Sequence, residues 1–163
     1  KIVPVSISYE YDPTDALKMP QLLALSKDEV YIKEKNEDFI TLLSGIIGQK
    51  KRIHIHVCDV LENEYEKIKA ETDNNNKQIQ AVAQVIDDSI LQSYKLWPTN
   101  FIAFDILYKT SKFAHLYDEK ERQLFERRLE MRIDADNETM KEGFLAMYAN
   151  PVVNKLKYTH DIA

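Results

Sequence analysis

The sequence predicts a helix-rich α/β protein in which helices cover a sheet of few strands. Residues 3–8 and 52–57 are short apolar or alternating runs of the kind that form strands. Most of the remaining chain repeats apolar residues at helical spacing. A chain of 163 residues is long enough for one hydrophobic core. We therefore expect a single unit, with a sheet portion at 1–60 and a helical portion at 61–163.

The first expected strand is apolar on both faces. Val3, Val5 and Ile7 form one face, and Pro4 lies near the start, where a missing backbone N–H costs least. Strands of this kind are typical of the middle of a sheet, buried on both sides. Because the sequence offers few other strands to flank it, we expect its neighbours to lie upstream of Lys1, in a larger protein.

Two helices are expected between the strands. Asp12 is a suitable N-cap and Pro13 a suitable first helical residue, and Pro20 is expected to interrupt the helix that they begin. Asn36 is expected to cap a second helix over 37–47, which ends at a glycine. Its apolar stripe, expected to pack on the core, comprises Phe39, Ile40, Leu43 and Ile47.

The portion after residue 60 is expected to be helical throughout. A long helix over 76–97 has the clearest periodicity, and Asn100 is expected to cap a short helix through Tyr108. The stripe of the long helix, expected to be core, comprises Ile79, Val82, Ala83, Ile86, Ile90, Tyr94 and Trp97.

Two further helices are expected near the end of the chain. Asp118 and Glu121 are spaced as a capping box and should begin a charged helix. Asn137 should cap a last helix over 138–148, which Pro151 should end. The stripe of the charged helix comprises Leu124, Phe125, Leu129 and Ile133.

The segment RIHIHVCD, 52–59, holds a histidine and an aspartate in His-x4-Asp spacing. In a strand, side chains alternate between faces, so His54 and Asp59 point opposite ways and are about 17 Å apart at ~3.3 Å per residue. A base and its orienting carboxylate must be within hydrogen-bond reach, so this pair is not catalytic. His54, His56 and Cys58 share a face, and at most two of them could reach one metal ion. We expect a half-exposed strand face, with the aliphatic face of the strand as its core face, and no metal.

The composition restricts the function classes. A net charge of −5 argues against general nucleic-acid binding, which needs clustered lysine and arginine. One cysteine forms no internal disulfide, no signal peptide opens the chain, and no run approaches the ~18 apolar residues of a membrane span. These features predict a protein of the cytoplasm.

Four segments follow one another along the chain: IVPVSISYEYDPTDALK, GIIGQKKRIHIHV, WPTNFIAFDIL and MYANPVVNKL. In this order they resemble the C-terminal half of bacterial glycerolipid acyltransferases of the 1-acylglycerol-3-phosphate acyltransferase type. The resemblance implies that the chain is the C-terminal portion of a glycerolipid acyltransferase fold. It also implies that Ile2, Val3, Pro4 and Val5 are the hydrophobic-Val-Pro-Val block of the family, which lies near the acceptor and acyl sites.

The implied reaction moves a fatty acyl group from acyl-CoA or acyl carrier protein to a lysophospholipid or related lipid hydroxyl. Val3, Pro4, Val5 and Glu10 are the candidates for substrate contact, with Glu10 placed just past the strand. A solvated charge cluster is the simpler interpretation of residues 50–52. The candidates for contact with a lipid or donor phosphate are Lys50, Lys51 and Arg52.

The catalytic block of this family is a His-x4-Asp pair on a turn that leads into a helix, where the histidine takes the proton from the acceptor hydroxyl. That block, and a Phe-Pro-Glu-Gly block that helps hold the phosphate, precede the Val-Pro-Val block. Neither occurs here, because His54 and Asp59 follow the Val-Pro-Val block and lie on a strand. We therefore expect no catalytic residue in this chain, no cofactor beyond the acyl thioester co-substrate, and no activity from the chain alone.

The resemblance places the parent protein in the cytoplasm, at the cytoplasmic face of the inner membrane, as a peripheral protein that meets its lipid acceptor there. The rival hypothesis is a non-enzymatic helical scaffold or interaction domain whose amphipathic helices bind a partner. A third hypothesis is a metal-dependent hydrolase built on the strand HIHVCD.

Overall fold

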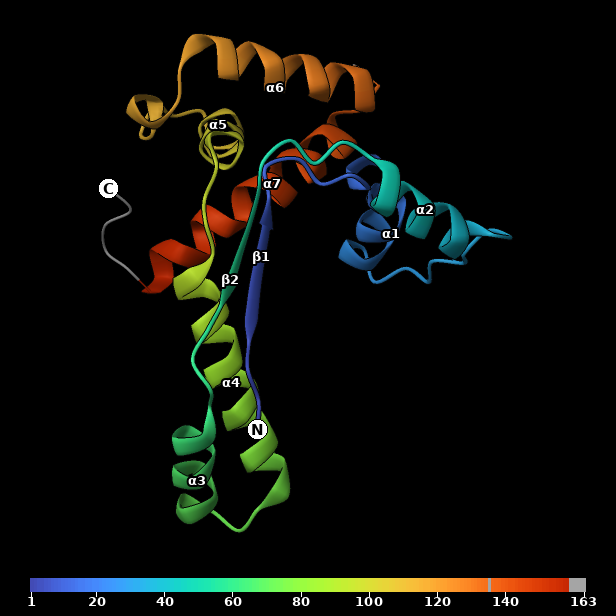
Figure 1. The fold of residues 1–163 in the computed structure, drawn as a ribbon. Helices are drawn as coiled ribbons and strands as arrows, with labels where there is room; N and C mark the ends of the chain where they lie inside the picture. The colour runs from blue at the N-terminus through green and yellow to red at the C-terminus, as the bar shows by residue number, and fades with distance from the viewer. Residues whose placement is uncertain (135, 159–163) are drawn as a thin grey trace. The chain divides into compact units, whose positions relative to one another are not determined.

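The computed structural model describes residues 1–134 and 136–158. It is helix-rich with a small two-stranded sheet, so the predicted class, helix-rich α/β, is confirmed (Figure 1). The elements in chain order are β1 (Val5–Tyr9), α1 (Asp15–Ser26), α2 (Glu37–Ile47), β2 (Ile53–Val57), α3 (Glu62–Glu71), α4 (Asn75–Ser93), α5 (Pro98–Leu107), the 3-10 helix η1 (Ala114–Leu116), α6 (Glu119–Arg132) and α7 (Glu138–Tyr158).

The chain packs as two compact units, and each is assembled from segments that are far apart in the sequence. Of the described residues, the first unit takes 1–8, 53–95 and 154–158. The second unit takes residues 9–52 and 96–153.

In the first unit, β1 and β2 pair as antiparallel strands beside α4 (Figure 1). The amide of Cys58 donates to the carbonyl of Pro4 at 3.0 Å just beyond the end of β2. The second strand therefore extends the sheet that the first begins, as expected.

The first strand was expected to be buried on both faces, but only its polar face is buried. Ser6 and Ser8 of β1 are buried, and the Ser6 hydroxyl donates to the carbonyl of Ile90 in α4 at 3.2 Å. Val5 and Ile7 point the other way and are 43% and 45% exposed. Small serine side chains let the helix approach the strand closely enough for this hydrogen bond, so α4 covers the polar face.

The aliphatic face of β2 is open as well. The prediction that its aliphatic residues form the core face is wrong, because Ile53, Ile55 and Val57 are all exposed. The opposite face is the one that meets α4, where Cys58 Sγ lies 3.6 Å from the carbonyl oxygen of Ser89. One face of the sheet is therefore covered by a helix, and its aliphatic face is open.

Helix α4 begins near the predicted start but is shorter. Asn74 caps it, since its side chain accepts from the amides of Asn76 and Lys77. No residue within α4 is buried, and Trp97, the one buried member of the predicted stripe, lies beyond its end at Ser93. The prediction of a core stripe here is wrong, because the described part of the chain packs few side chains against this face of α4.

The core of the second unit is formed by α5, α6 and α7. Phe125 and Phe144 are fully buried, and the ring of Tyr148 meets that of Phe125 edge-on at 5.2 Å between centroids. The predicted stripe of α6 is largely confirmed, with Leu129 and Ile133 also buried. Leu124, the remaining member of that stripe, is 43% exposed.

Two prolines were expected to break helices, and neither does. Helix α1 continues past Pro20, and α7 continues past Pro151 to Tyr158. An interior proline costs a helix ~3 kcal/mol. Burial of Met19 beside the first proline and of Val152 beside the second offsets that cost.

Helix starts differ from the prediction where side chains compete for the cap. Helix α1 begins at Asp15 and not at Pro13, because Asp12 Oδ1 accepts from both the amide and the hydroxyl of Thr14 at 2.8 Å and shapes a turn before the helix. Asn100 lies inside α5, where its side-chain oxygen accepts from the amide of Trp97 at 2.7 Å.

Helix α2 has the predicted bounds, but Asn36 makes no side-chain cap and adopts a left-handed backbone with φ 69°. Its predicted core stripe is also wrong, because Phe39 and Ile47 are 65% and 74% exposed.

The predicted capping box of α6 is confirmed, as is the cap that Asn137 gives α7. Asp118 Oδ1 accepts from the amide of Glu121 at 2.7 Å, and the Glu121 carboxylate accepts from the amide of Asp118 at 3.2 Å.

We expect Asp118→Ala to lower the free energy of unfolding by about 1 kcal/mol, because one backbone donor loses its acceptor. Urea unfolding measures this, with Glu119→Ala as the control in the same turn. Equal stability of Asp118→Ala and the wild type would contradict the prediction.

Candidate functional site

The carboxylate of Glu10 lies just past the end of β1 and is completely buried. Lys51 donates to its Oε1 at 2.6 Å, and Arg52 donates to Oε2 through Nε at 2.5 Å and to Oε1 through Nη2 at 3.1 Å. The guanidinium of Arg52 also lies over the ring of Trp97, 5.0 Å from its centroid. Glu10 therefore holds two cations from the segment before β2.

Burial by itself raises the pKa of the Glu10 carboxyl, but the hydrogen bonds and charges of Arg52 and Lys51 outweigh it. The net result is a pKa below the ordinary value of 4.5. A carboxylate with this pKa is ionised at neutral pH and fixed by its partners. Glu10 is thus a positioning group for two cations and is poorly suited to carry a proton.

A second buried carboxylate belongs to Asp15, the first residue of α1. Arg128 of α6 donates to Asp15 Oδ2 at 2.8 Å through Nε and to the carbonyl of Asp12 at 3.0 Å. Tyr148 of α7 donates its hydroxyl proton to the same Asp15 oxygen at 2.9 Å, and its hydroxyl oxygen accepts from the amide of Asp12. The guanidinium of Arg128 lies over the ring of Tyr11, 4.4 Å from its centroid.

Burial, followed by the charge of Asp15, raises the pKa of Tyr148 far above its ordinary value of 10. The phenol therefore keeps its proton at neutral pH and donates it to Asp15.

Two hydrogen bonds join these charges to the rest of the unit. The Thr99 hydroxyl donates to the carbonyl of Glu10, and the Asn100 side-chain amide donates to the carbonyl of Tyr148, both at 2.9 Å. Both donors are buried at the start of α5. We call the resulting set the buried polar network; its members are Glu10, Asp15, Thr99, Asn100, Arg128 and Tyr148.

Some of the predicted substrate-contact residues are exposed in the structure and others are buried. Val3 and Val5 are each 43% exposed on the open face of the sheet, whereas Pro4 is buried. Glu10 is buried beneath the cations that bind it. Only the first two of these side chains face solvent.

Of the three predicted phosphate contacts, two converge. Lys51 and Arg52 meet on Glu10 and keep 29% and 48% of their side chains exposed. Lys50 points away, and its ammonium donates to backbone carbonyls at the end of α2. Arg52 also lies 3.3 Å from Glu121, so two carboxylates balance the two converging cations. An anion at this surface would therefore meet exposed hydrogen-bond donors, but the net charge of the two cations and two carboxylates is close to zero.

The sequence patterns described above select neither Arg128 nor Asp15. The signal that identifies Arg128 is its position three residues after Phe125, on the buried stripe of α6. A charged residue at a core position needs a buried partner. Asp15, which is 0% exposed, is that partner.

On the helix-facing side of β2, the rings of His54 and His56 stack with centroids 6.4 Å apart. Cys58 Sγ lies 3.5 Å from the Ser93 hydroxyl. Among residues 1–134 and 136–158, no group of three or more histidine, cysteine or acidic side chains is placed to hold a metal ion.

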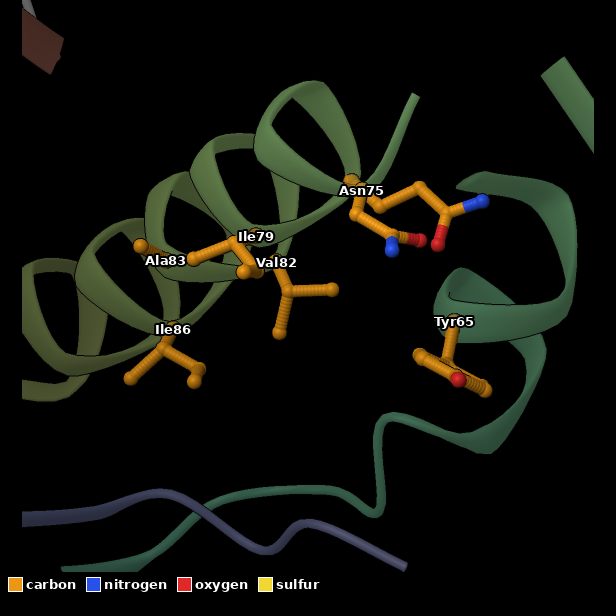
Figure 2. A pocket seen from close by; sticks show the side chains of 7 residues that line it. Tyr65, Asn75, Ile79, Val82, Ala83 and Ile86 are labelled. Atoms are coloured by element: carbon orange, nitrogen blue, oxygen red, sulfur yellow. The ribbon is translucent and has the colours of Figure 1, made fainter. Parts of the chain in front are cut away.

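An open groove of about 470 Å³ lies between α3 and α4 in the first unit. Figure 2 shows the side chains that line it. Tyr65 lies on α3, across from Val82 and Ile86 of α4, and Asn75 is at one end. Four members of the α4 stripe that was expected to be core line the groove, and Ile79 among them is 66% exposed.

Across the described chain, each helix is too short or too polar to cross a bilayer.

Searches against protein-family models, curated proteins and solved structures gave no match for this chain.

Proposed function

We propose that this chain is the C-terminal part of an acyltransferase that moves a fatty acyl group from acyl-CoA or acyl carrier protein to the hydroxyl of a lysophospholipid or related lipid. The catalytic His-x4-Asp block would come from the parent protein, since this chain has none in the family position.

One observation supports the proposal most. The four segments that carry the resemblance contact one another through the buried polar network and the two cations bound to Glu10. Glu10 and Asp15 come from the first segment, and Lys51 and Arg52 from the second. The third segment supplies Thr99 and Asn100, and the fourth supplies Tyr148. The four segments are therefore joined by hydrogen bonds within one unit, as parts of one site would be.

In this proposal the network holds the end of the Val-Pro-Val strand and the loop that follows it. Glu10 anchors that loop to Lys51 and Arg52, whose exposed donors are then available to a phosphate. Charge-assisted hydrogen bonds of this kind are suited to positioning a substrate. The role of this chain is therefore substrate binding, with proton transfer performed elsewhere in the parent protein.

The test is an acyl-transfer assay on the parent protein, with release of the thiol from the acyl thioester as the readout. We expect transfer to a lysophospholipid by the parent protein and none by the 163-residue chain alone. Absence of transfer by the parent protein from both acyl-CoA and acyl carrier protein would contradict the proposal.

In the parent protein, we expect the double variant Lys51→Gln/Arg52→Gln to raise KM for the lipid acceptor roughly tenfold and to leave kcat within about twofold, because each lost contact with a phosphate weakens binding. The variant also leaves the buried Glu10 carboxylate without these two cations, so the assay is run at a temperature at which circular dichroism shows the variant to be folded. Arg122→Gln is the matched control, since Arg122 is 41% exposed in an ion pair with Glu126. An unchanged KM for the double variant would remove these residues from the acceptor site.

A further inference from the structure

Helix α2 packs on the protein through its polar face and turns its apolar face outward. Gly45, Thr41 and Ser44 are half-buried, and a side chain at Gly45 would lie 3.9 Å from Thr14. The approach is closest at Gly48, just past the helix, where an added Cβ would meet Pro13 Cβ at 2.7 Å. Small residues thus fix α2 beside the turn that precedes α1.

The outward face of α2 is entirely hydrocarbon. It holds six large apolar side chains, each between 43% and 74% exposed. They are Phe39, Ile40, Leu42, Leu43, Ile46 and Ile47. The loop before α2 adds Val30 and Ile32, which are 89% and 83% exposed. A soluble monomer rarely leaves such a stretch in water, so this surface has a partner.

The charges around α2 favour an anionic surface. The chain as a whole carries −5, but residues 30–52 contain five cations and three carboxylates. Glu10 binds Lys51 and Arg52, and Asp38 binds Lys33, so Lys35 and Lys50 are the cations of this segment that pair with no carboxylate among the described residues. The residues from Phe39 to Gln49 include no charged side chain. Lysines stand at both ends, with Lys33 and Lys35 before the helix and Lys50 after it. This pattern is suited to lysine side chains that reach lipid headgroups while the helix lies at the hydrocarbon boundary.

The geometry points to a lipid bilayer as the partner, and we propose that α2, with the preceding loop at Val30 and Ile32, docks the protein on a membrane surface by lying in its interface. A protein interface carries about one hydrogen bond per 100–200 Å², and the outward face of α2 offers no donor or acceptor. A hydrocarbon phase requires none. The helix has only 11 residues, so it can lie in the interface but cannot cross the bilayer.

This inference rests on the proposed function only in that an enzyme that acylates a lysolipid works at a bilayer. Its test measures binding without acyl transfer. Failure of docking therefore leaves the acyl-transfer assay intact, and failure of the acyl-transfer assay leaves docking intact.

The experiment is co-sedimentation of the 163-residue chain with sucrose-loaded vesicles of phosphatidylcholine and phosphatidylglycerol. We expect the wild type to bind, and the double variant Leu42→Asp/Ile46→Asp to lose at least about tenfold in affinity, because both side chains would enter hydrocarbon. The matched control is Ile55→Asp/Val57→Asp. These residues are 62% and 65% exposed on the sheet, against 63% and 67% for Leu42 and Ile46, so charge change and exposure are equal.

A second measurement does not depend on how the aspartate variants fold. Phe39→Trp adds an indole at a 65% exposed position, and the only natural tryptophan, Trp97, is buried. We expect its emission to shift to the blue on vesicles and to be quenched by brominated lipid. Vesicles of phosphatidylcholine alone should bind more weakly, because the flanking lysines then lose their anionic partners.

Three results would each overturn the proposal. The first is no sedimentation of the wild type with anionic vesicles. The second is an equal loss of binding in the sheet variant, which would assign the surface to β1 and β2. The third is an unusual response of the indole at position 39: either vesicles do not change its emission, or the emission shifts without lipid when the protein concentration is raised. A shift without lipid would show that a second copy of the chain covers α2.

Discussion

Replacing Arg128 with alanine is expected to lower the free energy of unfolding by about 3 kcal/mol, because it leaves the buried carboxylate of Asp15 with the weaker partner Arg132, whose Nε lies 3.7 Å away and whose side chain is 38% exposed. Asp15 is 0% and Arg128 7% exposed, so water cannot replace the lost partner. The Tyr148 hydroxyl would still donate to Asp15, but it carries no charge. Since small proteins are stable by only ~5–15 kcal/mol, this single change removes a large share of the total.

Urea unfolding followed by circular dichroism measures the loss. The control is Arg122→Ala on the same helix, whose ion pair with Glu126 is about 40% exposed on each side and should contribute only ~0.3–0.5 kcal/mol. A loss below about 1 kcal/mol for Arg128→Ala would mean that Asp15 finds water or another cation, and the buried pair would then have no special role.

Replacing Glu10 with glutamine is the second large effect. At pH 7 we expect a loss of about 1.5–3 kcal/mol, because the hydrogen bonds from Lys51 and Arg52 lose their charged acceptor. The free energy of unfolding of the variant should also decrease less than that of the wild type as the pH falls. The folded-state pKa of Glu10 lies below 4.5, so its ion pairs stabilise the protein fully above about that pH and lose their effect as the pH falls through the folded value.

The measurement is the urea midpoint between pH 7 and pH 3 for both proteins. We expect the difference in midpoint between wild type and Glu10→Gln to shrink as the pH falls. Asp12, whose pKa is also lowered despite its burial because Lys18 and Thr14 bind it, contributes acid sensitivity that both proteins share. Glu126→Gln, at an exposed pair, should differ little from the wild type at any pH. A constant difference for Glu10→Gln from pH 7 to pH 3 would contradict the assignment.

The proposed docking of α2 and the buried polar network belong to the second unit, and they divide its tasks. The network is polar, buried and fully bonded, and it fixes the loop after β1. Helix α2 is apolar and exposed, and it is held only by small residues at the turn before α1. Rigid support and a surface for a partner are thus built from adjacent segments of the chain.

Local sequence signals located elements well where the determining contacts are local. The bounds of α2 at 37–47 follow from its apolar run and the glycine after it. The capping box of Asp118 and Glu121 depends on only four consecutive residues, and the structure confirms it. Local signals failed at Pro20 and Pro151, because a buried side chain beside each proline offsets a local cost.

The candidate site was predictable only in part, for the same reason. Glu10, Lys51 and Arg52 were selected individually, but nothing in the sequence says that residues 10 and 51 meet. That contact depends on the antiparallel register of β1 and β2, which places the end of one strand beside the start of the other.

By itself, the sequence determined the class of the protein, the order of its helices and strands and most of their positions. These follow from apolar spacing and capping residues within a few positions of each other. The tertiary structure alone decided which face of each element is buried. Periodicity identifies an apolar face but not what lies against it. The serines of β1 and the small residues of α2 allowed close approach, so these polar faces turned inward and the aliphatic faces were left open.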